Sequence, residues 1–278
     1  MRFTKMEGLG NDYVYVDLFA ESLPNIDLPS LARAVSDRHF GIGSDGLVLI
    51  LPSEVGECRM RMFNSDGSEA EMCGNAVRCI AKLMFNAGRH KNGTVRIETM
   101  AGIIVANVRD VDNLKAYVEV DMGPPVFDPK RIPVLAEGNE ALDIPIEIEG
   151  RELRFNAVSM GNPHCVIFAD EVDDRMVHGL GPKIENHRLF PEKTNVEFVK
   201  VSDRGNIEMR VWERGAGETL ACGTGACASV AACIRSGLCD HTVDVRLLGG
   251  TLTISWPEND TIRMKGPARI VFTGEMEL

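Results

Sequence analysis

The sequence predicts an α/β protein of two pseudo-symmetric halves, each a mixed β-sheet or barrel wrapped around a central apolar helix. Strand-like stretches outnumber helical ones along the 278 residues. Two helical stretches are nearly free of charge. Residues 223–234 contain no charged side chain, and after Asn75 only Arg78, Lys82 and Asn86 interrupt the other stretch. A helix that is apolar all round must be surrounded by protein, so each is expected at the centre of a sheet.

The elements of the first half follow from its short apolar runs. Runs rich in Val, Ile, Leu and aromatic residues, bounded by turn residues, predict strands. Such runs lie at 13–17, 47–51, 59–63, 94–98, 103–108 and 116–120. Longer stretches at about 27–37 and 75–86 predict helices. A glycine turn at Gly102 joins two of the strands.

The second half repeats this style. Strands are expected at 155–159, 165–168, 196–201, 207–212, 243–247 and 251–256, and helices at about 175–185 and 224–236. The apolar helix is again followed by a strand, a glycine turn (Gly249 and Gly250) and another strand. The two halves therefore share one plan.

Two cysteines open the two apolar helices, and the segments around them match. Cys73 is followed by Gly74, Asn75 and Ala76, and Cys222 by Gly223, Thr224 and Gly225. In both segments a Glu stands four residues before the Cys and a second Gly fifteen residues after it; these residues are Glu69 and Gly88, and Glu218 and Gly237. A duplicated thiol at a helix start can place two thiols face to face across one pocket. That geometry suits removal of a proton from one side of a carbon and its return to the other.

The predicted halves define two domains with a shared cleft. The stretch from Met122 to Pro125 is expected to be the first crossing between them, and a second crossing near Lys265 to Pro267 would return the C-terminal strand. The N-terminal half is then 1–122 plus 267–278, carrying Cys73. The C-terminal half is 123–266, carrying Cys222.

Composition excludes several function classes. The net charge of −11 and the absence of a basic stripe argue against nucleic acid. No apolar run approaches a membrane span, and the N-terminus lacks a signal-peptide core, so we expect a cytoplasmic protein. The eight cysteines include no Cys-x-x-Cys pair, and the spacing of residues 222, 227, 233 and 239 matches no zinc pattern. We expect no metal. The other six cysteines are expected to be buried small hydrophobic residues; they are Cys58, Cys79, Cys165, Cys227, Cys233 and Cys239.

The start of a helix changes the chemistry of a thiol. The unpaired N–H groups and the dipole there can lower the pKa of a cysteine from its ordinary value of about 8.5 into the neutral range. The same groups favour a bound carboxylate, and Gly74 and Gly223 let a ligand approach the backbone. Each cysteine could thus supply both a base and part of a carboxylate cradle.

Several strings together resemble one known family. They begin at Met6-Glu7-Gly8-Leu9-Gly10-Asn11-Asp12, continue through Asn64-Ser65-Asp66-Gly67-Ser68, Met72-Cys73-Gly74-Asn75-Ala76 and Ser159-Met160-Gly161-Asn162-Pro163-His164, and end with Asn195-Val196 and the segment from Glu213 through Cys222 to Gly225. In this order, along nearly the whole chain, they are similar to diaminopimelate epimerase.

The resemblance implies a two-base epimerase that interconverts LL- and meso-diaminopimelate without any cofactor. Cys73 and Cys222 would be the acid/base pair, with His164 and Glu213 tuning their pKa values. The implied substrate contacts are Asn11, Asn64, Gly74, Asn75, Asn162, Asn195, Glu213, Arg214, Gly223 and Thr224. The family acts in lysine and peptidoglycan precursor synthesis. Its partners are expected to be a small amino-acid substrate and, at most, a second copy of the chain in a homodimer.

Some of these residues have a physical case of their own. Arg214 can bind a distal carboxylate through two parallel hydrogen bonds, and the asparagines offer both donors and acceptors to a zwitterion. One departure is Gly46, where some family members have Gln, so a polar contact is missing here or supplied otherwise.

Two alternatives remain open. A proline or hydroxyproline racemase shares the two-cysteine logic and the fold, although such enzymes typically have Cys-Gly-His where this chain has Cys73-Gly74-Asn75. A binding module with a redox-active pair of cysteines belongs to a different class. Exchange of solvent deuterium into the substrate would separate an enzyme from a binder.

Overall fold

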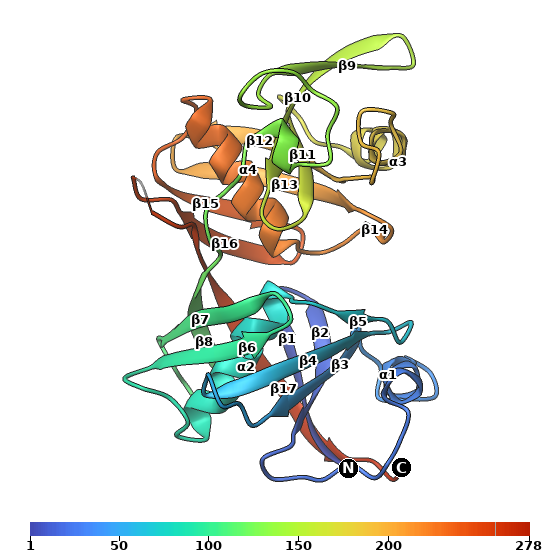
Figure 1. The fold of residues 1–278 in the computed structure, drawn as a ribbon, viewed down its shortest axis with the longest axis vertical. Coiled ribbons are helices and arrows are strands. Elements are labelled where there is room, and N and C mark those ends of the chain that lie inside the picture. Colours follow the sequence, from blue (N-terminus) through green and yellow to red (C-terminus); the bar gives the residue numbers. More distant parts are fainter. Residues whose placement is uncertain (259) are drawn as a thin grey trace. The chain divides into compact units, whose positions relative to one another are not determined.

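The computed structural model describes residues 1–258 and 260–278, and the chain divides into two compact units (Figure 1). Unit 1 comprises Met1–Asp121 and Lys265–Leu278, and unit 2 comprises Met122–Met264. In each unit, a row of strands surrounds one long buried helix. The predicted fold class, a mixed α/β structure built around two apolar helices, is confirmed.

Unit 1 is a closed barrel. Its strands are β1 (Arg2–Gly8), β2 (Asn11–Asp17), β3 (Gly46–Leu51), β4 (Cys58–Asn64), the short β5 (Glu69–Ala70), β6 (Thr94–Thr99), β7 (Gly102–Arg109), β8 (Lys115–Asp121) and β17 (Arg263–Glu275). Eight of them pair in the order β17-β1-β2-β3-β4-β6-β7-β8, and β8 pairs with β17 to close the ring. The pairs β2–β3 and β4–β6 are parallel. Because parallel neighbours need a crossover, each is joined through a helix: α1 (Leu28–Ser36) and α2 (Gly74–Asn86).

Helix α2 packs against β1, β6, β7 and β8. Most of its apolar side chains are completely buried, and so are Arg78 and Lys82. These two cations need partners because an unpaired buried charge is costly. Lys82 donates to Asn86 Oδ1 (2.9 Å) and to the carbonyl oxygen of Asp112 (2.6 Å), and Arg78 donates to the carbonyl oxygen of Pro267 (3.0 Å). The polar interruptions of this helix therefore tie it to the barrel wall.

Unit 2 is a mixed sheet curved around α4 (Gly223–Arg235), which contacts six of its strands. The strands are β9 (Ile144–Ile148), β10 (Arg151–Ser159), β11 (Pro163–Phe168), β12 (Asn195–Asp203), β13 (Asn206–Glu213), the short β14 (Gly217–Glu218), β15 (Thr242–Leu247) and β16 (Gly250–Ser255). They pair in the order β9-β10-β11-β12-β13-β15-β16, with β14 beside β13. Three smaller helical segments, a 3-10 turn at Pro129–Arg131, a π-helix at Arg175–Leu180 and α3 (Gly181–Glu185), complete the described part of the unit.

The order of elements in unit 1 recurs in unit 2. An antiparallel pair (β1–β2; β10–β11) leads through a helix to a parallel neighbour (β3; β12). An antiparallel partner (β4; β13), a two-residue strand and the buried helix follow, and a hairpin comes next (β6–β7; β15–β16). The predicted duplication is thus present in the topology.

All twelve predicted strands are found, and α1 begins where expected, with the Asp27 carboxylate accepting a hydrogen bond from the N–H of Ser30 (3.0 Å). The helix predicted at 175–185 differs, because its first six residues, Arg175–Leu180, form a π-helix before α3 begins. Pro182 has no N–H to donate, which interrupts the ordinary ladder at that point. Among the described residues, no helix is long and apolar enough to cross a membrane.

Candidate active site

In unit 1 the predicted site residues gather where α2 begins. Cys73 is the N-cap of α2, in an extended conformation, and its side chain does not cap the helix. The thiol lies 3.7 Å from Asn11 Oδ1, as its donor, and Asn75 Nδ2 donates to the same oxygen at 3.2 Å. Asn75 Oδ1 accepts in turn from the buried Arg78 (2.6 Å). The structure therefore brings Asn11, Cys73 and Asn75 together.

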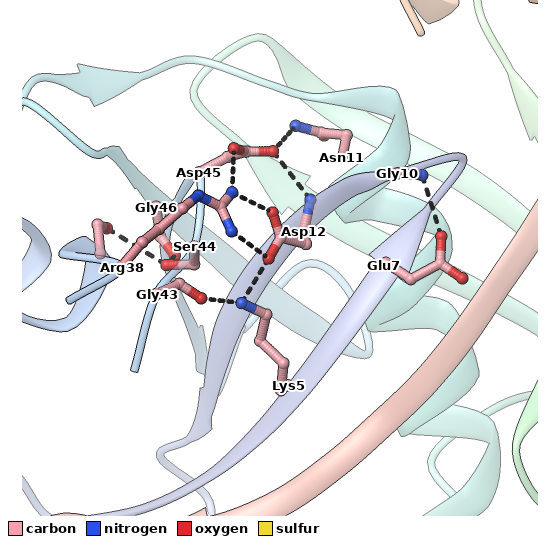
Figure 2. Close-up of polar contacts among 11 residues, drawn as sticks. Lys5, Glu7, Gly10, Asn11, Asp12, Arg38, Gly43, Ser44, Asp45 and Gly46 are labelled. Carbon is pink, nitrogen blue, oxygen red and sulfur yellow. Dashed lines mark hydrogen bonds and ion pairs between the residues drawn. The ribbon is translucent and has the colours of Figure 1, made fainter. Parts of the chain in front are cut away.

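A cluster of charged side chains fixes the position of the Asn11 side chain (Figure 2). Asn11 Nδ2 donates to Asp45 Oδ2 (2.8 Å), and Arg38 bridges Asp45 and Asp12 at 3.0 and 2.8 Å. Lys5, which is almost completely buried, pairs with Asp12 and donates to the carbonyl oxygen of Gly43. Burial opposes ionisation of Asp12, but hydrogen bonds from Arg38 and Lys5 outweigh it and lower its pKa. The cluster fixes the β2 end that carries Asn11.

Asn64 lies at the end of β4, opposite Gly46 on β3, and donates to Ser68 Oγ at 3.0 Å. A Cβ atom added at Gly46 would lie 2.1 Å from the carbonyl oxygen of Phe63 and 2.9 Å from the Tyr13 ring. A glutamine at this position therefore does not fit this backbone. Glycine at position 46 is a packing requirement.

In unit 2 the matching position is Cys222, the N-cap of α4, which is 6 % exposed. Gly223, the first residue of the helix, faces Met264, since an added Cβ would lie 2.9 Å from its sulfur. The Cys222 thiol lies 3.6 Å from the hydroxyl of Thr224, which receives a hydrogen bond from Asn162 Nδ2 at 3.3 Å. These contacts bring four predicted residues to one helix end.

The chain of contacts continues inward from Asn162. Its Oδ1 lies 3.0 Å from Nε2 of His164, and Nδ1 of His164 lies 2.7 Å from Oε1 of Glu197. His164 and Glu197 are both completely buried. Sequence reasoning missed Glu197. The available signal was a carboxylate directly between two apolar residues, Val196 and Phe198, of a predicted strand, since a buried acid requires a partner.

Glu213, at the end of β13, lies beside Cys222 and accepts a hydrogen bond from the hydroxyl of Thr219. Burial raises the pKa of Glu213, and the Thr219 hydrogen bond only partly offsets it. Burial also raises the pKa of the Cys222 thiol well above its ordinary value, and the charges of Glu213 and Glu197 add to this. The prediction that the helix start would lower this pKa is therefore wrong for Cys222. The Thr224 and Gly225 contacts do act in the predicted direction, but they are outweighed.

Asn195 and Arg214 are positioned together. Asn195 Oδ1 accepts from the N–H of Arg214 (2.9 Å), and its Nδ2 donates to the carbonyl oxygen of Pro163 (2.9 Å). One hydrogen bond of the Arg214 guanidinium goes to the carbonyl oxygen of Glu192 (3.3 Å). Asn195 thus joins the starts of β11 and β12 to the turn that carries Arg214.

The remaining cysteines are free and buried, as predicted. Burial raises the pKa values of Cys58 and Cys79 to about 12. Within residues 1–258 and 260–278, no group of three His, Cys, Asp or Glu side chains is arranged to hold a metal ion.

Comparison with known proteins identifies relatives over the whole chain. A family model described as diaminopimelate epimerase matches residues 3–127 and 156–271. The chain is 54 % identical to the diaminopimelate epimerase of Acetivibrio thermocellus, over 100 % of this chain and 99 % of that one. It is 51 % identical to the protein of the same name from Methanococcus maripaludis, over the full length of both.

Solved structures show the same fold at much lower identity. A probable proline racemase from Agrobacterium radiobacter, with bound carbonate, superposes with a TM-score of 0.70 at 14 % identity, over 100 % of this chain and 93 % of that one. A PhzF-family phenazine biosynthesis protein from Bacillus anthracis superposes with a TM-score of 0.68 at 17 % identity, over 100 % and 99 %. At these identities the likeness concerns the fold alone.

Proposed function

The chain belongs to the diaminopimelate epimerase family, and we propose that it interconverts LL- and meso-diaminopimelate, with Cys73 and Cys222 as the two acid/base groups. The observation that supports this most is the repeated placement of a thiol. Each unit puts one cysteine at the N-cap of its buried helix, beside side chains that can bind an amino acid.

The reaction needs one thiolate and one thiol. The thiolate removes the α-proton, and the thiol delivers a proton to the opposite face of the carbon. Without a ligand, burial and neighbouring carboxylates raise the pKa of Cys222, which favours its thiol form. The substrate of the opposite hand requires the reverse assignment, and the two thiols titrate as a coupled pair.

Removing the α-proton places negative charge on the adjacent carboxylate. The free N–H groups at the starts of α2 and α4 are fixed donors for this charge and cost no reorganisation during the reaction. Asn11, Asn75 and Asn162 offer both donors and acceptors to the ammonium and carboxylate groups. Arg214 suits the distal carboxylate that distinguishes a diamino diacid from proline.

This function implies a place in the cell. A cofactor-independent enzyme of this kind would act in the cytoplasm, on small-molecule substrate, in lysine and peptidoglycan precursor synthesis. A homodimer is the assembly we propose.

The test follows solvent deuterium. Purified protein, kept reduced, is incubated in D₂O with LL-diaminopimelate and, separately, with L-proline. We expect deuterium at the α-carbon and conversion to the meso isomer with diaminopimelate, and neither with proline. Turnover of proline alone would assign the racemase function instead, and exchange with neither substrate would exclude an epimerase of either kind.

A further inference from the structure

His164 and Glu197 form a buried pair of ionisable side chains that the proposed two-thiol mechanism does not itself use. His164 lies on β11 and Glu197 on the parallel strand β12, and Nδ1 of the ring is 2.7 Å from Oε1 of the carboxylate. Both side chains are completely shielded from solvent. Since burying two ionisable groups is costly unless they stabilise one another, the pair needs a reason beyond packing.

The hydrogen-bond partners assign the protons on the ring. Nε2 faces Asn162 Oδ1 at 3.0 Å, while the amide nitrogen of Asn162 points to the Thr224 hydroxyl at 3.3 Å. A carbonyl oxygen accepts and cannot donate, so Nε2 of His164 is the donor to Asn162. On the other side of the ring, the 2.7 Å contact holds a proton between Nδ1 and Oε1 of Glu197.

The second carboxylate oxygen supports the same assignment. Oε2 of Glu197 is buried and has no hydrogen-bond partner among the described residues. A proton on Oε2 would be a buried donor without an acceptor. The proton that the pair shares therefore lies between Oε1 and Nδ1.

The pair lies against the start of α4. A Cβ added at Gly225 would lie 2.7 Å from Glu197 Oε1 and 3.3 Å from the sulfur of Cys222. The other ionisable groups that act on this cluster are Glu213 from β13 and Cys165 from β11. The hydrogen bonds run from the ring of His164 through Asn162 and the Thr224 hydroxyl to the sulfur.

We propose that Glu197 is a positioning residue for the reaction at Cys222: the proton that it shares with Nδ1 of His164 fixes the ring, with Nε2–H directed at Asn162. The ring then holds Asn162 with Oδ1 toward Nε2, so that its amide N–H binds Thr224. The Thr224 hydroxyl hydrogen is left to bind the sulfur when Cys222 is a thiolate. When the sulfur takes the α-proton, the hydroxyl turns to accept from the S–H. This role rests on the proposed function.

The test compares two carboxylates on neighbouring strands. Glu197→Gln keeps the shape of the side chain and removes the charge, and Glu208→Gln removes a half-exposed carboxylate of β13 that pairs with Arg246. We expect kcat to fall on the order of 10- to 100-fold in the first variant, as for other residues that orient a functional group from behind, with little change in KM. The acid limb of its pH–rate profile should shift. The second variant should match the unmodified protein in both, and Glu197→Asp should recover part of the rate.

A second readout does not depend on turnover. In ¹⁵N-histidine-labelled protein without substrate, Nε2 of His164 should give the signal of a protonated nitrogen, with His164→Gln used to assign it. An unprotonated Nε2 in the unmodified protein would overturn the proposal, even if Glu197→Gln did not fold. A wild-type pH profile in Glu197→Gln would overturn it as well. Loss of epimerase activity in all proteins, with the predicted ring signals intact, would instead count against the proposed function.

Discussion

Gly225→Ala is a one-carbon change at the centre of the unit 2 site. The added Cβ would lie 2.7 Å from Glu197 Oε1 and 3.3 Å from the sulfur of Cys222. The carboxylate would have to move by roughly 0.7 Å before ordinary van der Waals contact begins. It can do so only by lengthening its 2.7 Å contact with His164 or by pushing on the helix start.

Two energies oppose each other in this variant. Alanine in place of glycine inside a helix stabilises by up to about 1 kcal/mol, while overpacking a buried site costs about 1–3 kcal/mol. The free energy of unfolding should therefore fall by about 0–3 kcal/mol. Turnover should fall more clearly, since displacement of a site group by about 1 Å can cost on the order of 100-fold.

The matched control is Gly179→Ala in the π-helical segment, where no atom of the described residues lies within 4 Å of the added Cβ. This variant should gain about 0.4–1 kcal/mol and keep full activity. Urea unfolding at constant m-value and steady-state turnover measure both effects. A Gly225→Ala protein that is as stable and as active as Gly179→Ala would refute the close packing of Glu197 against α4.

Three further outcomes follow from the structure. Because burial and nearby carboxylates raise the pKa of Cys222, its alkylation by iodoacetamide should be slow at neutral pH and accelerate as pH rises past the ordinary thiol range. Mass spectrometry of the peptide that contains Cys222 measures the rate. A rate that levels off below neutral pH would contradict this prediction. Asp45→Ala removes the 2.8 Å anchor of Asn11 and should raise KM by about tenfold, which corresponds to one hydrogen bond to a charged group; an unchanged KM would show that the anchor is dispensable. Phe198→Ala in the core of unit 2 should lower the free energy of unfolding, measured in urea, by about 3–5 kcal/mol. Phe40→Ala, at a side chain that is 94 % exposed, should change the free energy of unfolding by no more than about 0.5 kcal/mol. Similar losses at both positions would contradict the assigned burial.

The sequence predicted those features that depend on local pattern. Apolar runs located the strands, and the lack of charge in 223–234 identified a helix surrounded by protein, since few other environments accept such a helix. The matched segments around Cys73 and Cys222 predicted the duplicated topology. Each of these signals is carried by residues that are close together along the chain.

The features that depend on distant residues were not predicted. The pKa of Cys222 is set largely by its burial and by Glu213 and Glu197, which come from two other strands, and a helix-end argument does not include them. In the sequence Glu197 is a single acidic residue in a strand. Its role becomes apparent only from the 2.7 Å distance between its Oε1 and Nδ1 of His164. Likewise, the need for glycine at Gly46 is apparent only from the nearby carbonyl oxygen of Phe63 on β4.

The most direct test of the two-thiol mechanism uses Cys73→Ala and Cys222→Ala separately, measuring α-proton exchange and epimerisation of LL- and meso-diaminopimelate in D₂O. Each variant should lose epimerisation by several orders of magnitude, because inversion requires a group on both faces of the carbon. Cys58→Ala, which removes a buried thiol outside the proposed mechanism, is the control and should remain active. Undiminished epimerisation in either of the first two variants would remove that thiol from the mechanism.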